Sequence, residues 1–152
     1  MATASLGFRV LDAHVVAGRA DETAWHDGTR NLTFAQLVHE VATVAGGLRA
    51  LGVREGDVVA LDLSGPERVL AVLALVRLGA RDGDGGSVRL VDGPDGPVAS
   101  VGTDQVAWAV LRDAGRADPA PALRADVEGY AEAVRARHAD LLEPLLRGEA
   151  VA

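Results

Sequence analysis

Cysteine and lysine are both missing from this chain of 152 residues, and aromatic residues make up only 3% of it. The absence of cysteine excludes disulfides, thiol nucleophiles and thiolate metal ligands. The absence of lysine means that all 15 basic residues are arginine. Acidic residues outnumber them and are spread along the chain, which gives a net charge of −7 and no basic surface for nucleic acid.

Long hydrophobic runs are missing as well. No apolar stretch approaches the roughly 20 residues of a membrane-spanning helix, and the N-terminus lacks the charged and apolar regions of a signal peptide. Hydrophobic residues still make up 49% of the sequence, which is enough to form a core. We therefore expect a cytoplasmic protein that folds as one compact domain.

The strongest helix pattern covers residues 33–51. Thr33 and Gln36 have the spacing of a capping box, and Leu32 and Leu37 have the spacing of a hydrophobic staple. Between these signals and the end of the segment, apolar residues recur at helical spacing, which predicts an amphipathic helix. These residues are Phe34, Leu37, Val38, Val41, Val44, Ala45, Leu48 and Leu51.

A buried strand and a second helix follow. Gly52 is a typical C-terminal stop for the first helix, and the apolar run within 57–63 predicts a buried strand. Ser64 is positioned to cap the next helix, and Pro66 suits its first turn. That helix, 66–78, is apolar on nearly all sides. A helix, a strand and a helix in this order predict an α/β fold.

The amino-acid sequence of this part of the chain resembles that of a known family. The sequence reads LTFAQL at 32–37, GGLRALGVREGDVVAL at 46–61, and begins SGPE and ends LVRLGA within 64–80. A hairpin-like WHDGTR precedes these motifs at 25–30. Together they resemble the N-terminal region of the adenylate-forming superfamily, which includes acyl-CoA synthetases, peptide-synthetase adenylation domains and luciferases. The resemblance covers residues 6–80.

The resemblance implies a scaffold without the chemistry of the family. Such enzymes are several times longer, hold the ATP phosphates on a Ser/Thr/Gly-rich loop ending in lysine, and use a further lysine on a small C-terminal domain. This chain has no similar loop and no lysine, and arginine does not simply replace a lysine placed on a phosphate. We expect no catalysis from the chain alone, and no catalytic, cofactor-binding or metal-binding residues. As part of an enzyme, it would belong to an ATP-dependent acid ligase.

After residue 80 the sequence departs from the family pattern. The glycine-rich segment 81–86 predicts a flexible joint, and two β-rich runs around Asp92-Gly93-Pro94-Asp95 predict a hairpin over 87–100. The segment VRLVDG at 88–93 is loosely similar to a hairpin that lies much further along the sequences of the same superfamily. The chain is then either a family member with a large internal deletion, or a family-like unit, 1–80, followed by a divergent segment, 81–152.

The C-terminal third predicts helices. A helix over 105–113 would be capped by Thr103 or Asp104, and a Pro/Ala linker would follow over 115–121. Residues 122–146 form one helix or two, in which Pro144 either lies in the first turn of a short final helix or kinks a longer one. Leucines at its end either pack on the same chain or dock a partner.

Several residues of types found in active sites lack the sequence pattern that catalysis or metal binding needs. Ser64 lacks the glycine pattern of a nucleophile elbow, and the glycines and aspartates of 82–86 lack the further ligands of a Ca²⁺ loop. The histidines have no helical metal spacing: His14, His26, His39 and His138. Trp25 is expected in the core. The residues best suited to an interface are Trp108, Leu141, Leu142, Leu145 and Leu146.

Two functional hypotheses remain. The first is a noncatalytic AMP-dependent synthetase-like protein that acts as a binding or assembly module. An isolated subdomain of the family exposes apolar surface, and such surface usually marks an interface. The second is one piece of a split acyl- or aminoacyl-adenylating ligase that needs a partner carrying the ATP site. For either, we expect a homodimer or a partner protein, with no nucleic acid, membrane or cofactor bound.

Overall fold

The computed structural model describes residues 3–152 and contains two compact units. Unit 1 combines the chain up to Glu40 with Ala122–Ala152, and unit 2 is Val41–Pro121. The boundary at Glu40 falls inside a helix, so each unit contains part of the segment that resembles the adenylate-forming family. The division at residue 80, which comes from sequence resemblance, stays a prediction.

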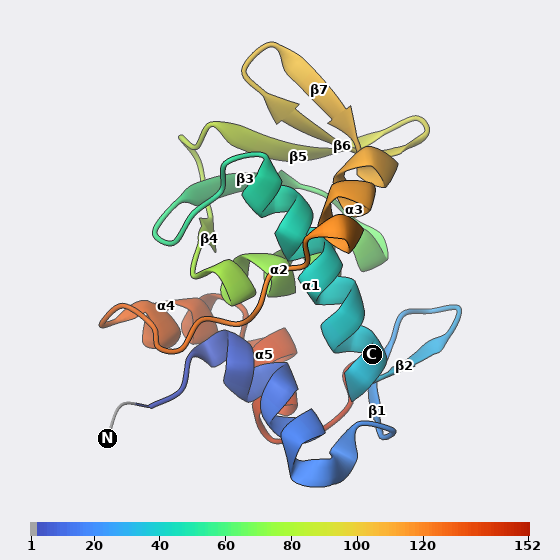
Figure 1. The fold of residues 1–152 in the computed structure, drawn as a ribbon, viewed down its shortest axis with the longest axis vertical. Coiled ribbons are helices and arrows are strands. Elements are labelled where there is room, and N and C mark those ends of the chain that lie inside the picture. Colours follow the sequence, from blue (N-terminus) through green and yellow to red (C-terminus); the bar gives the residue numbers. More distant parts are fainter. Residues whose placement is uncertain (1–2) are drawn as a thin grey trace. The chain divides into compact units, whose positions relative to one another are not determined.

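Unit 1 combines the N-terminal and C-terminal segments of the chain (Figure 1). Strand β1 pairs antiparallel with β2, which confirms the expected hairpin. Val151 donates its N–H to Ala24 and accepts one from His26, so the C-terminal segment lies along β1. The elements of this unit are the π-helices η1 (Phe8–Asp12) and η2 (Val15–Arg19), strands β1 (Thr23–His26) and β2 (Asn31–Thr33), and helices α4 (Tyr130–Arg137) and α5 (Ala139–Leu146).

Helix α1 (Phe34–Ala50) begins and ends as the sequence predicts. The Thr33 backbone N–H donates to Gln36 Oε1 at 2.9 Å, and the Gln36 N–H donates to Thr33 Oγ1 at 3.2 Å, which completes the capping box. At the other end Gly52 has φ +103°. The next residue, Val53, donates its N–H to the Leu48 carbonyl, as in a Schellman motif.

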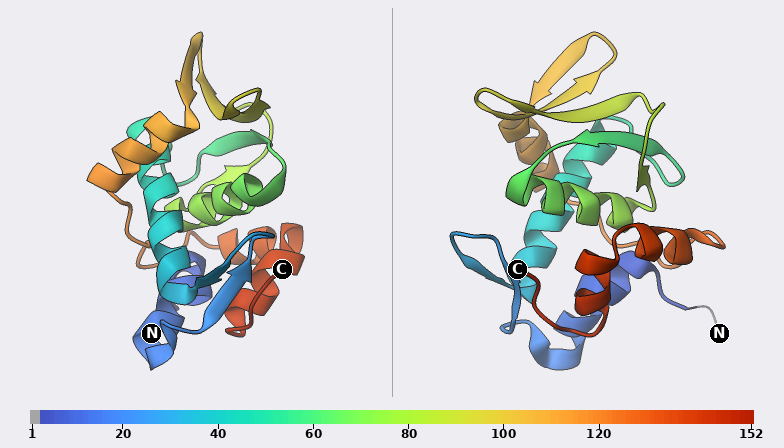
Figure 2. Two further views of the ribbon diagram at one scale, coloured as in Figure 1. Left: turned by 90° about the vertical axis from the view of Figure 1, so that its right-hand side faces the viewer. Right: turned by 180° about the vertical axis from the view of Figure 1, so that it is seen from behind.

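Unit 2 is built on a five-stranded mixed sheet in the order β4-β3-β5-β6-β7. Strand β3 runs parallel to both β4 and β5, whereas β5, β6 and β7 are antiparallel neighbours. The fold is therefore mixed α/β, as expected. Its elements are β3 (Val58–Asp62), α2 (Gly65–Leu78), β4 (Arg81–Asp82), β5 (Val88–Gly93), β6 (Gly96–Val101), β7 (Asp104–Ala107) and α3 (Trp108–Ala117). Figure 2 shows the β6–β7 ribbon projecting away from the helices of this unit.

Strand β3 is less buried than the sequence suggests. Val59 and Leu63 are buried, and Asp62 is exposed. Ala60 and Leu61 are half-buried. Successive side chains in a strand point to opposite faces, so one face of β3 is covered more fully than the other. The predicted buried strand is therefore only partly buried, although its position and its two flanking helices are confirmed.

The segment 81–86 is a second correction. Arg81 and Asp82 form strand β4, and the Gly83 N–H donates to the Val59 carbonyl at 3.0 Å. A Cβ added to Gly86 would lie 1.7 Å from the carbonyl oxygen of Val58. Gly86 permits close passage beside β3, whereas Gly85 has nothing within 4 Å of an added Cβ. The expected joint is therefore partly a strand that pairs with β3, and the flexibility of its remainder stays a prediction.

The predicted helix over 105–113 begins later than expected. Asp104–Ala107 form β7, joined to β6 by a two-residue turn in which Gly102 has φ +63°. Helix α3 then starts at Trp108 and runs through residue 117, so it also takes up the start of the predicted linker. Further on, the helical region is two helices, and Pro144 lies inside α5 instead of in its first turn.

Helices α1 and α3 pack in unit 2 with their backbones in contact. A Cβ added to Gly115 would lie 1.6 Å from the Thr43 carbonyl oxygen, and one added to Gly47 would lie 2.3 Å from that of Leu111. Glycine is therefore required on both helices at this crossing. Just beyond α3, the Ala120 N–H donates to the Ala42 carbonyl at 3.1 Å. The segment after residue 82 is thus anchored directly on α1.

Candidate functional site

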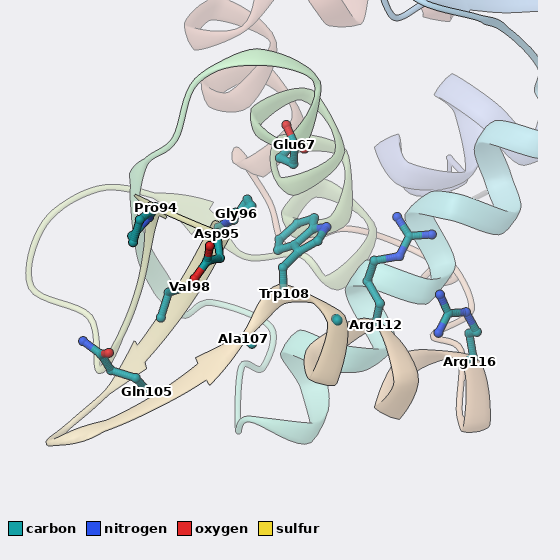
Figure 3. Close-up of a pocket in the computed structure, with 12 residues that line it drawn as sticks. Glu67, Pro94, Asp95, Gly96, Val98, Gln105, Ala107, Trp108, Arg112 and Arg116 are labelled. Atoms are coloured by element: carbon teal, nitrogen blue, oxygen red, sulfur yellow. The ribbon is translucent and has the colours of Figure 1, made fainter.

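A groove with a volume of about 640 Å³ opens on the surface of unit 2 (Figure 3). Its walls come from the N-terminal end of α2, the β5–β6 turn, strand β7 and helix α3. The start of strand β6 also lines it, so the N-terminal end of α2 meets the later segment 94–116 around one hollow. The polar and aromatic side chains that line it are Glu67, Asp95, Gln105, Trp108, Arg112 and Arg116.

Trp108 occupies the start of α3 and is half-buried. The preceding residue, Ala107, has an extended backbone and makes no side-chain cap, so the chain passes directly from strand to helix at the groove. Arg112 and Arg116 follow Trp108 at intervals of four residues, which places all three on one face of the helix. Helix geometry therefore aligns an indole and two guanidinium groups along one wall.

The charges in the groove are separated by sign. Glu67 and Asp95 come from α2 and the β5–β6 turn, whereas both arginines come from α3. Figure 3 shows both carboxylates to the left of both guanidinium groups, with the Trp108 ring between Asp95 and the arginines. Arg116 also pairs with Asp113 along the helix, and both of these side chains are more than half exposed.

The residue types that line this groove limit the chemistry it can carry out. Among the described residues that line it there is no histidine, serine or threonine, so a nucleophile paired with an imidazole base is not present there. Arginine and tryptophan are instead the residue types that contribute most to binding surfaces. The groove offers an apolar ring flanked by fixed charges of both signs.

The predicted interface residues fall into two separate sets. Trp108 lies in unit 2, whereas the four leucines lie on α5 in unit 1. Leu142 and Leu145 are fully buried, and Leu141 and Leu146 are half-buried. The assignment of all five residues to an interface stays a prediction. Because two of the four leucines are fully buried, exchanging all four would disturb folding before it could test association.

Ser64 has a different hydrogen bond from the one expected. Its backbone occupies the N-cap position of α2, but its side chain does not cap the helix. The hydroxyl instead donates to Asp92 Oδ2 at 2.8 Å, which joins the start of α2 to the end of β5. Side-chain capping by Ser64 is therefore a wrong prediction, because a carboxylate from the neighbouring strand is the available acceptor.

The histidines have structural contacts. His14 Nε2 lies 2.6 Å from the Leu145 carbonyl oxygen, and a His26 ring nitrogen contacts the Asn31 side chain. Across residues 3–152 no three histidine or acidic side chains are grouped in a way that could hold a metal ion. Nor is any helix in that part of the chain long and apolar enough to cross a membrane.

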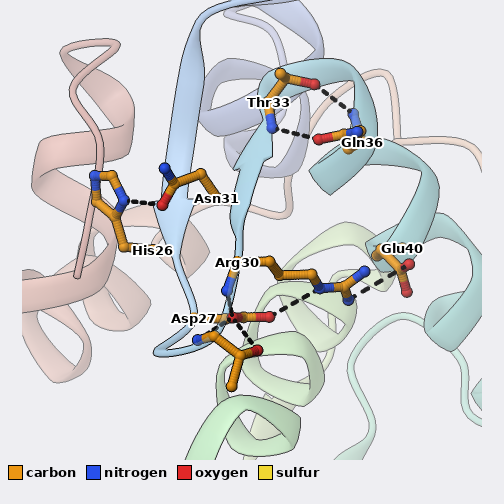
Figure 4. A network of polar contacts seen from close by, with 8 residues as sticks. His26, Asp27, Arg30, Asn31, Thr33, Gln36 and Glu40 are labelled. Carbon is orange, nitrogen blue, oxygen red and sulfur yellow. Dashed lines mark hydrogen bonds and ion pairs between the residues drawn. The ribbon is translucent and has the colours of Figure 1, made fainter.

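A polar network at the β1–β2 turn was not predicted from the sequence (Figure 4). Asp27 Oδ1 accepts the backbone N–H groups of Thr29 and Arg30, at 3.0 and 2.8 Å. These hydrogen bonds lower the pKa of the Asp27 carboxyl well below its usual range, and the Arg30 side chain adds to the effect. Arg30 also lies 3.8 Å from Glu40 on α1. An aspartate two residues before Thr29 is the local signal of such a turn.

Comparison with known proteins finds similarity in the first part of the chain. Residues 12–82 match the family described as AMP-binding enzyme. Acetyl-coenzyme A synthetase from Rhodopirellula baltica is 45% identical over 85 residues, and the enzyme from Streptomyces coelicolor is 40% identical over 84 residues. These alignments cover 48% and 51% of this chain but only 13% of each relative.

Two solved structures are also similar. They are the anthranilate CoA ligase AuaEII in complex with anthranoyl-AMP, with 32% identity, and an E. coli MenE variant with bound OSB-AMS, with 30% identity. Each superposes with a TM-score of 0.45, covering 51% and 54% of this chain and 15% and 18% of the respective ligase. The predicted resemblance is confirmed: residues 12–82 are similar to the AMP-binding enzymes, and the groove beside Trp108 is built mainly from residues beyond that segment.

Proposed function

We propose that this chain is a noncatalytic binding or assembly module built on a segment of the AMP-binding ligases. The observation that supports this most strongly is the pairing of β3 with β5. Strand β3 lies within the segment that matches the family, whereas β5 lies beyond it. The chain's own divergent residues thus complete the sheet around the family-like strand.

The composition supports the same function. Adenylation in the family is expected to need lysines at the ATP phosphates, and all the basic residues here are arginine. The groove beside Trp108 combines a tryptophan with charged side chains suited to recognition. A fold that keeps the ligase-like scaffold and presents such a groove serves association instead of acid activation.

The alternative is one piece of a split adenylating ligase. The 45% identity to an acetyl-coenzyme A synthetase favours it, because a piece of a working ligase would keep sequence similarity of this kind. In that case a second polypeptide would carry the phosphate loop and the lysines. The neighbouring reading frames would encode those missing parts.

ATP–pyrophosphate exchange tests the proposal. The purified protein, supplied with ATP, Mg²⁺ and acetate or other carboxylic acids, should give no exchange above the buffer blank. A complete acetyl-coenzyme A synthetase serves as the positive control. Exchange that stays with the protein through successive purification steps would contradict the proposal. Exchange that appears only after the product of a neighbouring reading frame is added would instead support the split ligase.

A further inference from the structure

We propose that the groove beside Trp108 is the surface through which two copies of this chain form a two-fold symmetric dimer. This inference rests on the proposed assembly function and names its partner as a second copy of the chain. It starts from the separation of charge in the groove: Glu67 and Asp95 form the acidic side, and Arg112 and Arg116 form the basic side.

A two-fold axis makes this pattern self-complementary. In such an interface the same patch is used by both copies, and if one residue contacts a second, the second contacts the first. With the axis close to Trp108, rotation by half a turn places the acidic side of one copy opposite the basic side of the other. A purely acidic or purely basic partner would match only one side of the groove, so the pattern favours a second copy.

The side chains have the shape and exposure that this contact needs. Trp108 is half-buried, so part of its ring remains available near the axis, and tryptophan at the centre of an interface is a frequent anchor. The arginine side chains are long and lie along one face of α3. They can reach into the hollow of the facing copy, whose volume of about 640 Å³ accommodates them.

The ion pair that Arg116 makes on α3 does not prevent Arg116 from exchanging partners. Arg116 pairs with Asp113 three residues earlier, and these side chains are 54% and 73% exposed. An exposed pair of this kind contributes little stability. Away from the groove, the net charge of −7 makes two copies repel each other, so the dimer depends on the local match of charge in the groove.

Charge reversal followed by mixing tests the proposal. One variant carries Glu67→Arg and Asp95→Arg, so both sides of its groove are basic. The other carries Arg112→Glu and Arg116→Glu, so both sides are acidic. The wild type should sediment as a dimer at high micromolar concentration, and each variant alone should weaken the dimer about 100-fold and sediment as a monomer. An equimolar mixture of the two variants should form a heterodimer, which also demonstrates that both are folded.

The matched control changes the same charge elsewhere. Glu55→Arg with Asp84→Arg alters two exposed acidic residues of unit 2 that do not line the groove, and it should dimerise like the wild type. A monomeric wild type overturns the inference, as does a variant that still dimerises alone or a mixture that remains monomeric. None of these outcomes changes the exchange assay, so an inactive monomer would contradict the dimer and leave the noncatalytic function standing.

Discussion

Replacing Gly115 by alanine tests the contact between α1 and α3. Its Cβ would lie 1.6 Å from the Thr43 carbonyl oxygen, whereas real Cβ atoms essentially never approach within 3.0 Å. The distance between the added Cβ and this oxygen must therefore grow by at least 1.4 Å, the difference between these values. The Thr43 oxygen belongs to a helix backbone and cannot rotate away as a side chain would. We therefore expect a loss of stability at a position where alanine normally improves a helix.

The magnitude follows from two opposing effects. Alanine is better than glycine inside a helix by about 1 kcal/mol. Overpacking typically costs about 1–3 kcal/mol, and a displacement of more than 1 Å places Gly115→Ala at the upper end of that range. Separation of the helices also loosens the dispersion contacts around Leu111, which is 1% exposed. The expected net destabilisation is about 2 kcal/mol.

Urea unfolding followed by circular dichroism measures this change. With a dependence on urea of about 2 kcal/mol per molar, the midpoint should fall by about 1 M. Ala114→Gly, at the exposed neighbouring position on α3, serves as the control for helix propensity and should cost only about 1 kcal/mol. A Gly115→Ala protein as stable as the wild type, or more stable, would refute the backbone contact, because propensity alone predicts a gain.

Two further predictions concern unit 1. Thr33→Ala should lower the free energy of unfolding by about 1 kcal/mol because it removes one side of the capping box, whereas Thr33→Ser should retain most of it; equal losses in both variants would argue against the cap. Asp27→Asn should be less stable than the wild type at pH 7, because a carboxyl whose pKa is lowered by folding stabilises the folded state above its unfolded pKa of about 3.9. That advantage is lost as the pH falls through the folded pKa, so the difference in melting temperature should shrink below about pH 4, and a constant difference from pH 7 to pH 3 would contradict the assignment.

The elements that the sequence predicts well carry their own local signals. Helix α1 has a capping box at Thr33 and a glycine stop at Gly52, and both are present in the structure. Strand β3 and helix α2 follow from apolar runs bounded by turn residues. These signals act within a few residues, so they do not depend on the rest of the fold.

The elements that the sequence did not predict depend on contacts with other parts of the same chain. Strand β7 has only four residues, and its sequence Asp-Gln-Val-Ala is also typical of a helix start. Its pairing with β6 across a two-residue turn decides the outcome. Helical periodicity likewise could not decide whether the leucines of α5 pack on their own chain; Leu142 and Leu145 do.

The groove could be predicted only in part. Trp108 was conspicuous because aromatic residues are scarce, but Arg112 and Arg116 were not singled out. Their positions, four and eight residues after Trp108, were the available signal. The carboxylates opposite them come from α2 and the β5–β6 turn, and sheet pairing brings these segments to α3.

The close approach of Gly86 to strand β3 has a practical consequence for inserting tags or protease sites. A glycine-rich stretch is the usual choice for an insertion, but here Gly86 has no room even for a methyl group beside Val58. An insertion there would separate β3 from β4 and from β5, its two neighbours in the sheet. The turn at Gly102 is the better place, because nothing lies within 4 Å of a Cβ added there.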